Sequence, residues 1–275
     1  MILASSDRIQ LAFEKPLVLL KEAGTQSDYL FAISTVARKS PEYLEAHRIE
    51  NRGGRYLILD NGAFEESRPV DTETLLDLAE ELEADEVVAP DWLSDGDRTT
   101  QETLRFIEKL KKRGKLRDCK VQVCIQGRSV PLWLDCYNQL ASRDDVDVIG
   151  LTYWKVPDDL GEVLSYFGKM DRMEQGRLFL IHKLIGERFM VNKPHHLLGL
   201  CSVLGLEWYR NYANIRSLDT SLPITVGLEE ELLTHQTEKP REKLDFLRRE
   251  VTSRQRYAVV SNCAMLRQLC LREYV

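Results

Sequence analysis

Short apolar runs rich in β-branched residues recur along the chain, and segments with helical spacing lie between most of them. This alternation is typical of a parallel sheet built from βα units. Eight runs are predicted to be strands: residues 30–35, 56–61, 86–90, 120–126, 147–153, 177–183, 196–201 and 214–219. Residues 71–82, 98–113 and 130–142 are predicted helices, because their apolar residues recur at helical spacing.

Eight βα units in 275 residues match the size of a (β/α)8 TIM barrel, which usually takes about 250 residues. We therefore predict an α/β fold in one domain over residues 1–275, with the barrel at about 28–235 and extra C-terminal helices at about 240–273. A doubly wound open sheet is the alternative. It expects a glycine-rich phosphate turn after its first strand, and the segment AISTVARKSP (32–41) has no glycine.

The apolar runs and the cysteines indicate in which compartment the protein is expected. No apolar run approaches the roughly 20 residues that cross a bilayer, and the N-terminus does not have the pattern of a signal peptide. The six cysteines are scattered without a CxxC pair, which indicates reduced core thiols. The sequence predicts a soluble cytoplasmic protein with no membrane contact, no metal site and no cofactor.

Two basic clusters stand out against a net charge of −6, which disfavours non-specific coating of nucleic acid. One is KLKKRGKLRDCK (109–120), and the other is RREVTSRQRY (248–257). Each cluster is either a solvated helix face or a local contact for phosphates. The candidate nucleic-acid contacts are Arg248, Arg249, Arg254 and Arg256.

Acidic side chains fall at the ends of three predicted strands: Asp60, Asp91 and Asp219. In a (β/α)8 barrel, functional residues gather at the carboxyl ends of the strands. Each aspartate could instead cap a helix or form a turn. Two carboxylates facing each other suit a reaction at an anomeric carbon, and a sugar hydrolase is one such enzyme.

Five segments resemble, in order, those of the tRNA-guanine transglycosylase superfamily, the queuine and archaeosine tRNA-ribosyltransferases. They are LDNGAFEES (59–67), VCIQG (123–127), VIGLTY (148–153), HLLGLCS (196–202) and SLDTSLP (217–223). The resemblance implies a pentosyltransferase in which Asp219 attacks the sugar C1′ and Asp60 is the general acid/base. It implies that Asp91 reads the edge of a guanine-like base. The other predicted substrate contacts are Asn61, Gly62, Phe64, Gln126, Gly127, Gly150, Thr152, Tyr153, Trp154 and His182.

The chain departs from the tRNA-acting members in one respect. Those members carry a zinc site of three cysteines and a histidine after the nucleophile, whereas residues 220–262 contain no cysteine here. The short chain looks like the phage-encoded relatives that place 7-deazaguanine derivatives into DNA, a means of restriction evasion in the host cytoplasm. DNA and a 7-deazaguanine base are therefore the expected partners. The alternatives are the same exchange on tRNA and a non-catalytic nucleic-acid-binding subunit of this fold.

Overall fold

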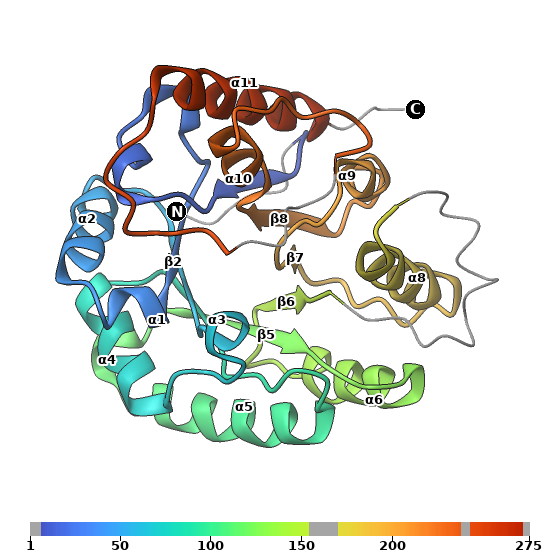
Figure 1. Ribbon diagram of the computed structural model, residues 1–275. Helices are drawn as coiled ribbons and strands as arrows, with labels where there is room; N and C mark the ends of the chain where they lie inside the picture. The colour runs from blue at the N-terminus through green and yellow to red at the C-terminus, as the bar shows by residue number, and fades with distance from the viewer. Residues whose placement is uncertain (1–6, 154–169, 238–242, 272–275) are drawn as a thin grey trace. The chain divides into compact units, whose positions relative to one another are not determined.

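The computed structural model describes residues 7–153, 170–237 and 243–271 (Figure 1). These residues fall into two units. Unit 1 contains Tyr29–Thr152 and Val191–His196. Unit 2 contains residues 7–28, 153, 170–190, 197–237 and 243–271. No helix among these residues has the length and apolar character needed to cross a membrane. The prediction of one domain over residues 1–275 stays a prediction.

The fold class is α/β of the (β/α)8 type, as predicted. The strands form one eight-stranded sheet in the order β1-β8-β7-β6-β5-β4-β3-β2. They are β1 (Gln10–Phe13), β2 (Leu30–Ile33), β3 (Leu57–Asp60), β4 (Glu86–Val88), β5 (Lys120–Ile125), β6 (Val148–Leu151), β7 (His195–Leu197) and β8 (Ile215–Thr220). Helices follow most of the strands, as βα units require.

Unit 1 holds five consecutive parallel strands, β2 to β6, in register from Ile33 opposite Asp60 to Ile125 opposite Leu151. Every residue of β2, β4 and β6 is buried, which is typical of parallel strands covered on both faces. Its helices are α1 (Ser34–Ala37), α2 (Pro41–Arg52), α3 (Ala63–Glu66), α4 (Thr72–Leu82), α5 (Gly96–Leu110), η3 (Gly114–Leu116) and α6 (Val130–Ala141).

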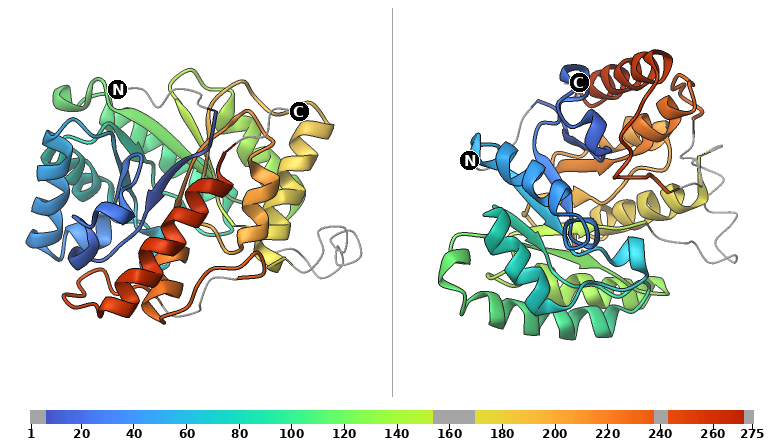
Figure 2. Two further views of the ribbon diagram at one scale, coloured as in Figure 1. Left: turned by 90° about the horizontal axis from the view of Figure 1, so that it is seen from above. Right: turned by 60° about the vertical axis from the view of Figure 1, so that its left-hand side comes forward.

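Unit 2 is built on the parallel pair β1 and β8, in which Ala12 lies opposite Asp219. Its helices are η1 (Leu17–Leu19), η2 (Ala23–Thr25), α8 (Arg172–Gly186), α9 (Val203–Tyr209), α10 (Leu222–Leu228) and α11 (Ser253–Leu269). A capping box of Thr252 and Gln255 begins α11. This helix lies beside the N-terminal segment, as the left panel of Figure 2 shows, and Ile9 N donates to Cys270 O at 3.1 Å.

The predicted strand at residues 177–183 is wrong, because this segment lies inside α8. Asp171 caps the helix by accepting hydrogen bonds from the backbone N–H groups of Met173 and Glu174. The buried residues Leu178, Ile181 and Leu184 recur every three residues, which is a helical period. A short apolar run viewed alone does not distinguish a strand from a buried helix.

Strand β1 was not predicted from the sequence; the sheet begins at residue 10 and not at about 28. The strand has only four residues, Gln10–Phe13, so it gives no extended pattern. The predicted helix at the start of the C-terminal tail is also wrong: residues 243–252 form turns and extended chain, and α11 begins at Ser253.

Replacing Leu11 of β1 tests this correction. Leu11 is 1% exposed, so we expect Leu11→Ala to lower the free energy of unfolding by about 2–5 kcal/mol through lost burial and the cavity left behind. Leu232→Ala is the control, because Leu232 is 54% exposed, and it should change this free energy by less than about 0.5 kcal/mol. Urea unfolding measures both, and equal effects would contradict the place of β1 in the core.

Candidate active site

The end of β3 is shaped by a turn that only glycine fits. Asp60 is half-buried, and its Oδ2 accepts a hydrogen bond from Gly62 N at 2.7 Å. Gly62 has φ +75°, and a Cβ there would lie 2.3 Å from Thr35 Cγ2. Glycine is therefore needed both for the left-handed backbone and for the close approach to Thr35. This turn holds the Asp60 carboxylate at the carboxyl end of the strand.

A buried hydrogen-bond network joins the ends of β3, β4 and β5. Asn61 Nδ2 donates to Asp91 Oδ1 at 2.7 Å, and Gln126 Nε2 donates to Asp91 Oδ2 at 2.6 Å. Asn61 also bonds Ala89 O and the backbone N–H of Ala63, which fixes the orientation of its amide. All three side chains are at most 5% exposed. The structure thus brings together three of the predicted substrate contacts, with the carboxylate in the centre.

Burial raises the pKa of the Asp91 carboxyl above its usual range, and the hydrogen bonds from Asn61 and Gln126 oppose this rise. Cys124 of β5 was not identified from the sequence as part of this site. Burial raises the pKa of its thiol, and the carboxylates of Asp91 and Asp60 raise it further. The thiol therefore stays neutral beside both acids.

Other predicted contacts in unit 1 have structural roles. A Cβ on Gly127 would lie 2.4 Å from Trp133 N, so this glycine allows α6 to pack closely. Gly150 pairs with Cys124 across β5 and β6, and Thr152 Oγ1 donates to Ile125 O at 3.1 Å. Phe64 differs from these residues, because it is 56% exposed on the short helix α3.

In unit 2, Asp219 lies near the end of β8 and is 4% exposed. Gly199 N lies 3.2 Å from each of its carboxylate oxygens. Gly199 has φ +75°, and a Cβ there would lie 2.5 Å from the Tyr153 hydroxyl. Gly199 and Tyr153 therefore pack together beside the predicted nucleophile. Trp154, the other predicted stacking residue, lies outside the described residues.

The predicted place of His182 at the end of a strand is wrong. The residue lies on α8, where its Nε2 is 2.7 Å from the Tyr212 hydroxyl and its ring meets Trp208 edge-on. Desolvation lowers the pKa of His182, which favours the neutral imidazole.

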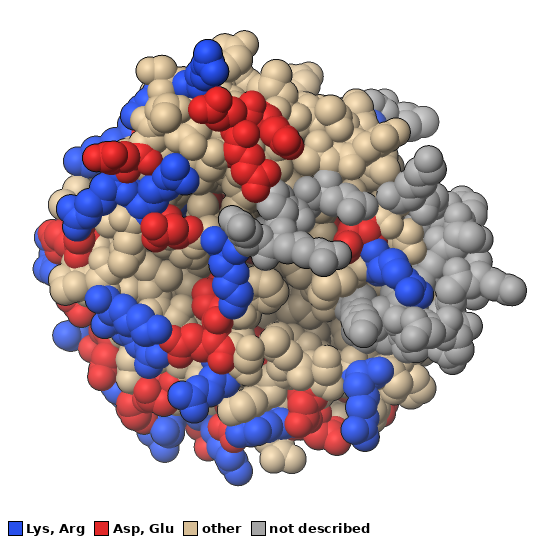
Figure 3. All heavy atoms as spheres, in the orientation of Figure 1, with Lys and Arg blue, Asp and Glu red and all other residues tan. Residues whose placement is uncertain are grey.

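The basic cluster at 109–120 is largely occupied by ion pairs. Arg113 bonds Glu73 at 2.8 Å and Asp77 at 2.9 Å, Lys109 bonds Glu73 at 2.8 Å, and Lys111 bonds Asp145 at 2.7 Å. The cluster also precedes β5 and ends at its first residue, so it lies at the opposite end of that strand from Gln126. On the face that Figure 3 draws, basic and acidic side chains are interleaved.

The cluster at 248–257 lies at the carboxyl end of β1. Leu17, which follows β1, donates to Phe246 O at 3.0 Å, whereas the end of α11 bonds Ile9, which precedes β1. Arg256 pairs with Glu22, and Arg248 Nε donates to Glu250 O at 2.8 Å. Arg249 and Arg254 are exposed. One turn from Arg254, Tyr257 is 69% exposed, a feature that the sequence analysis did not identify.

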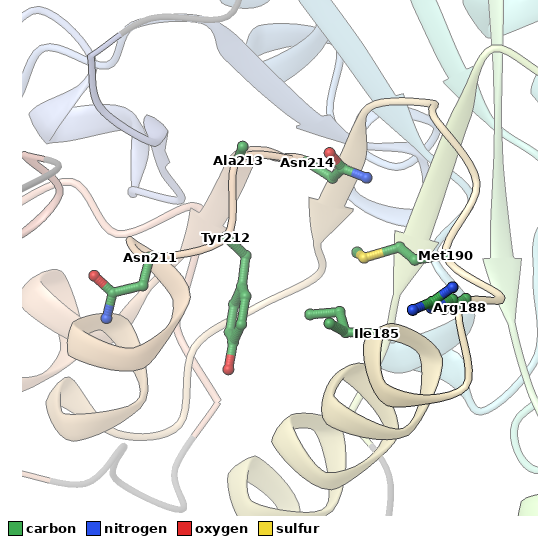
Figure 4. Close-up of a pocket in the computed structure, with 7 residues that line it drawn as sticks. All are labelled: Ile185, Arg188, Met190, Asn211, Tyr212, Ala213 and Asn214. Atoms are coloured by element: carbon green, nitrogen blue, oxygen red, sulfur yellow. The ribbon is translucent and has the colours of Figure 1, made fainter. Parts of the chain in front are cut away.

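Two surface pockets lie on the described residues, and one of them borders the residues on either side of Asp91. One, of about 360 Å3, is formed by the end of α8 and the loop before β8, where Tyr212 lies beside Ile185 and Met190 (Figure 4). It is therefore at the opposite end of β8 from Asp219. The other, of about 420 Å3, is lined by Pro90 and Trp92 and by the ion pair of Arg38 and Glu66. Neither pocket is lined by Asp60, Asp91 or Asp219.

No family profile matches the chain, and no curated protein sequence matches it either.

Asp91 should give the stability of the protein a distinct pH dependence. Between the ordinary Asp pKa of about 3.9 and its raised value, the folded state holds a proton that the unfolded state has released. The free energy of unfolding that this proton contributes at Asp91 is therefore lost as the pH rises through this window. Asp91→Asn removes this decline, which urea unfolding from about pH 4 to about pH 8 would detect.

Asp71→Asn serves as the control. Hydrogen bonds from Thr74 lower the pKa of Asp71, so its contribution to the free energy of unfolding is lost only as the pH falls below the ordinary Asp pKa of about 3.9, and it should stay nearly constant from about pH 5 to about pH 8. Asparagine caps α4 equally well, which keeps the helix intact. If wild type and Asp91→Asn differed by the same amount at every pH, the raised pKa of Asp91 would be refuted.

Proposed function

We propose that the protein is a base-exchange transglycosylase that replaces guanine in DNA with a 7-deazaguanine derivative through a covalent aspartyl-nucleoside intermediate. The observation that carries the proposal is the buried carboxylate of Asp91, whose two oxygens are held by Asn61 and Gln126. Guanine and 7-deazaguanine present neighbouring N–H donors on one edge. A fixed carboxylate is the acceptor that such an edge requires, and burial excludes competing water.

The proposed reaction uses two acids, Asp219 and Asp60. An oxygen of Asp219 forms a bond to C1′, the bond between C1′ and the base breaks, and guanine leaves with the electron pair. Asp60, initially protonated, gives its proton to guanine and then takes one from the incoming base. That base attacks C1′ and releases Asp219.

The surroundings of the two acids are compatible with these roles. Asp60 is half-buried, as suits an acid that gains and loses a proton. Asp219 is 4% exposed and accepts a backbone N–H.

DNA is the proposed substrate because residues 220–262 contain no cysteine for the zinc site of the tRNA-acting members. For a chain of net charge −6, affinity for DNA must come from local contacts. The exposed residues Arg249, Arg254 and Tyr257 offer charge and an aromatic face at the carboxyl end of β1. A flipped nucleotide requires such contacts around the site.

Exchange of labelled guanine into duplex DNA and into bulk tRNA, side by side, tests the proposal. We expect label in DNA with wild type, none above background with Asp219→Asn, and a rate reduced by about 10²-fold or more with Asp60→Asn, because a general acid/base is lost. Asp71→Asn, which changes an exposed helix cap, is the matched control and should exchange normally. A denaturing gel should show a protein–DNA adduct that depends on Asp219.

The outcomes separate the alternatives. Label in tRNA alone would assign the protein to the tRNA branch. Nucleic-acid binding without exchange into either substrate would indicate the binding-subunit alternative. Full exchange by a folded Asp219→Asn protein would refute the nucleophile.

The DNA contact is tested separately by Arg249→Gln/Arg254→Gln. We expect weaker binding to every DNA sequence and a log–log salt slope reduced by about 0.9 for each phosphate that the arginines no longer neutralise, while base preference is unchanged. Lys111→Gln/Arg113→Gln is the control from the ion-paired cluster and should leave affinity nearly unchanged. Fluorescence anisotropy at several salt concentrations measures both, and an equal reduction in affinity for the two double variants would contradict the assignment of the surface.

A further inference from the structure

Helix α8 buries an ion pair that the proposed reaction does not use. Glu174 and Arg177 are 0% and 1% exposed, and Arg177 Nη2 lies 2.5 Å from Glu174 Oε1. Burying two charges is unfavourable unless their remaining donors and acceptors are satisfied. Gly205 of α9 makes room for the acid, since a Cβ there would lie 2.6 Å from Glu174 Cγ.

The pair directs its other hydrogen bonds at the loop after β7. Arg177 Nη1 donates to Leu198 O at 3.1 Å and Nη2 donates to Gly199 O at 3.0 Å. Glu174 Oε2 accepts from Cys201 N at 2.8 Å. Two carbonyls and one N–H of four consecutive residues are therefore held by one ion pair.

Tyr209 and Tyr153 complete this arrangement. The Tyr209 hydroxyl donates to Glu174 Oε1, and Arg177 Nε lies 3.0 Å from the same hydroxyl. The guanidinium carbon lies 4.7 Å from the centre of the Tyr153 ring, a cation–π distance. Arg177 thus also contacts the aromatic ring that packs on Gly199.

The loop held in this way bears directly on Asp219. Gly199 is in the left-handed region, and its N–H points at both carboxylate oxygens of Asp219 at 3.2 Å. This N–H lies in the same planar peptide group as the Leu198 carbonyl, which Arg177 Nη1 holds, and Arg177 Nη2 holds the next carbonyl, that of Gly199. An error of about 1 Å in the position of a reacting group can reduce a rate by about 10²-fold.

We propose that Arg177 and Glu174 are positioning residues for Asp219, acting through the backbone of Gly199. This inference rests on the proposed function for its kinetic consequence. The geometric consequence does not depend on the proposed function. Changing the ion pair should disturb the position of the Asp219 carboxylate.

Two variants and one control test the proposal. Arg177→Lys keeps the charge but cannot reach two carbonyls and Glu174 together, and Glu174→Gln keeps the shape but loses the charge. Lys183→Met is the control, because Lys183 forms an exposed ion pair with Glu187 on the same helix. We expect kcat of guanine exchange to fall by about 10²-fold in both variants. KM for the base should stay within about two-fold, since the base contacts are elsewhere.

A second measurement does not depend on activity. In protein labelled with 13C at the aspartate carboxyl, the Asp219 resonance, assigned by its loss in Asp219→Asn, should shift in Arg177→Lys and Glu174→Gln but not in Lys183→Met. Circular dichroism and thermal unfolding report whether each variant folds.

The outcomes are distinguishable. A wild-type protein without exchange would refute the proposed function, while a shifted Asp219 resonance would still support the positioning role. Normal kcat and an unshifted resonance in folded variants would overturn the positioning role. Failure of both variants to fold would also overturn it, because the pair would then serve the fold alone.

Discussion

A carboxylate buried at the end of a parallel strand must find donors in the loops around it, and this constraint organises both acid sites. Asp91 receives side-chain amides from Asn61 and Gln126, which end or follow the neighbouring strands. Asp219 receives a backbone N–H from the loop after β7. The two sets of donors differ. The amide side chains at Asp91 are fixed by their own hydrogen bonds, whereas the direction of a loop N–H depends on the residues that hold the loop in place. The ion pair of Glu174 and Arg177 is therefore as much a part of the second site as Gly199.

Left-handed glycines recur at these loops because a strand that delivers an acid must turn at once. Gly62 and Gly199 both have φ +75°, and each lies against a side chain that leaves no room for a Cβ. Each also uses its N–H to bond an aspartate, Gly62 for Asp60 and Gly199 for Asp219. A substitution at either position would strain the backbone, displace a packed neighbour and disturb the donor together.

The alternation of strands and helices was enough to predict the fold class, because it depends on local pattern. The expectation that Asn61, Asp91 and Gln126 belong to one site came from the resemblance of their segments to the tRNA-guanine transglycosylases. The segment 177–183 was mistaken for a strand because its apolar run is short, and β1 was missed because it has only four residues. Glu174 and Arg177 have the spacing of an ordinary surface pair, so only tertiary packing reveals that they are buried. The basic cluster at 109–120 looks exposed in the sequence, but acids from other elements neutralise it. These acids come mainly from α4 and from the loop before β6.

The contrast between the two proposed catalytic acids follows from the same constraint. An acid that must release and recover a proton needs a route for that proton, and Asp60 keeps partial exposure with one backbone donor on Oδ2. A nucleophile needs a fixed position, and Asp219 is buried on a strand with a donor shared by both oxygens. The Gly199 N–H lies 3.2 Å from each of these oxygens and so helps to fix the orientation of the carboxylate. The roles that the resemblance implies for Asp60 and Asp219 are thus compatible with how each strand ends and with what its loop supplies.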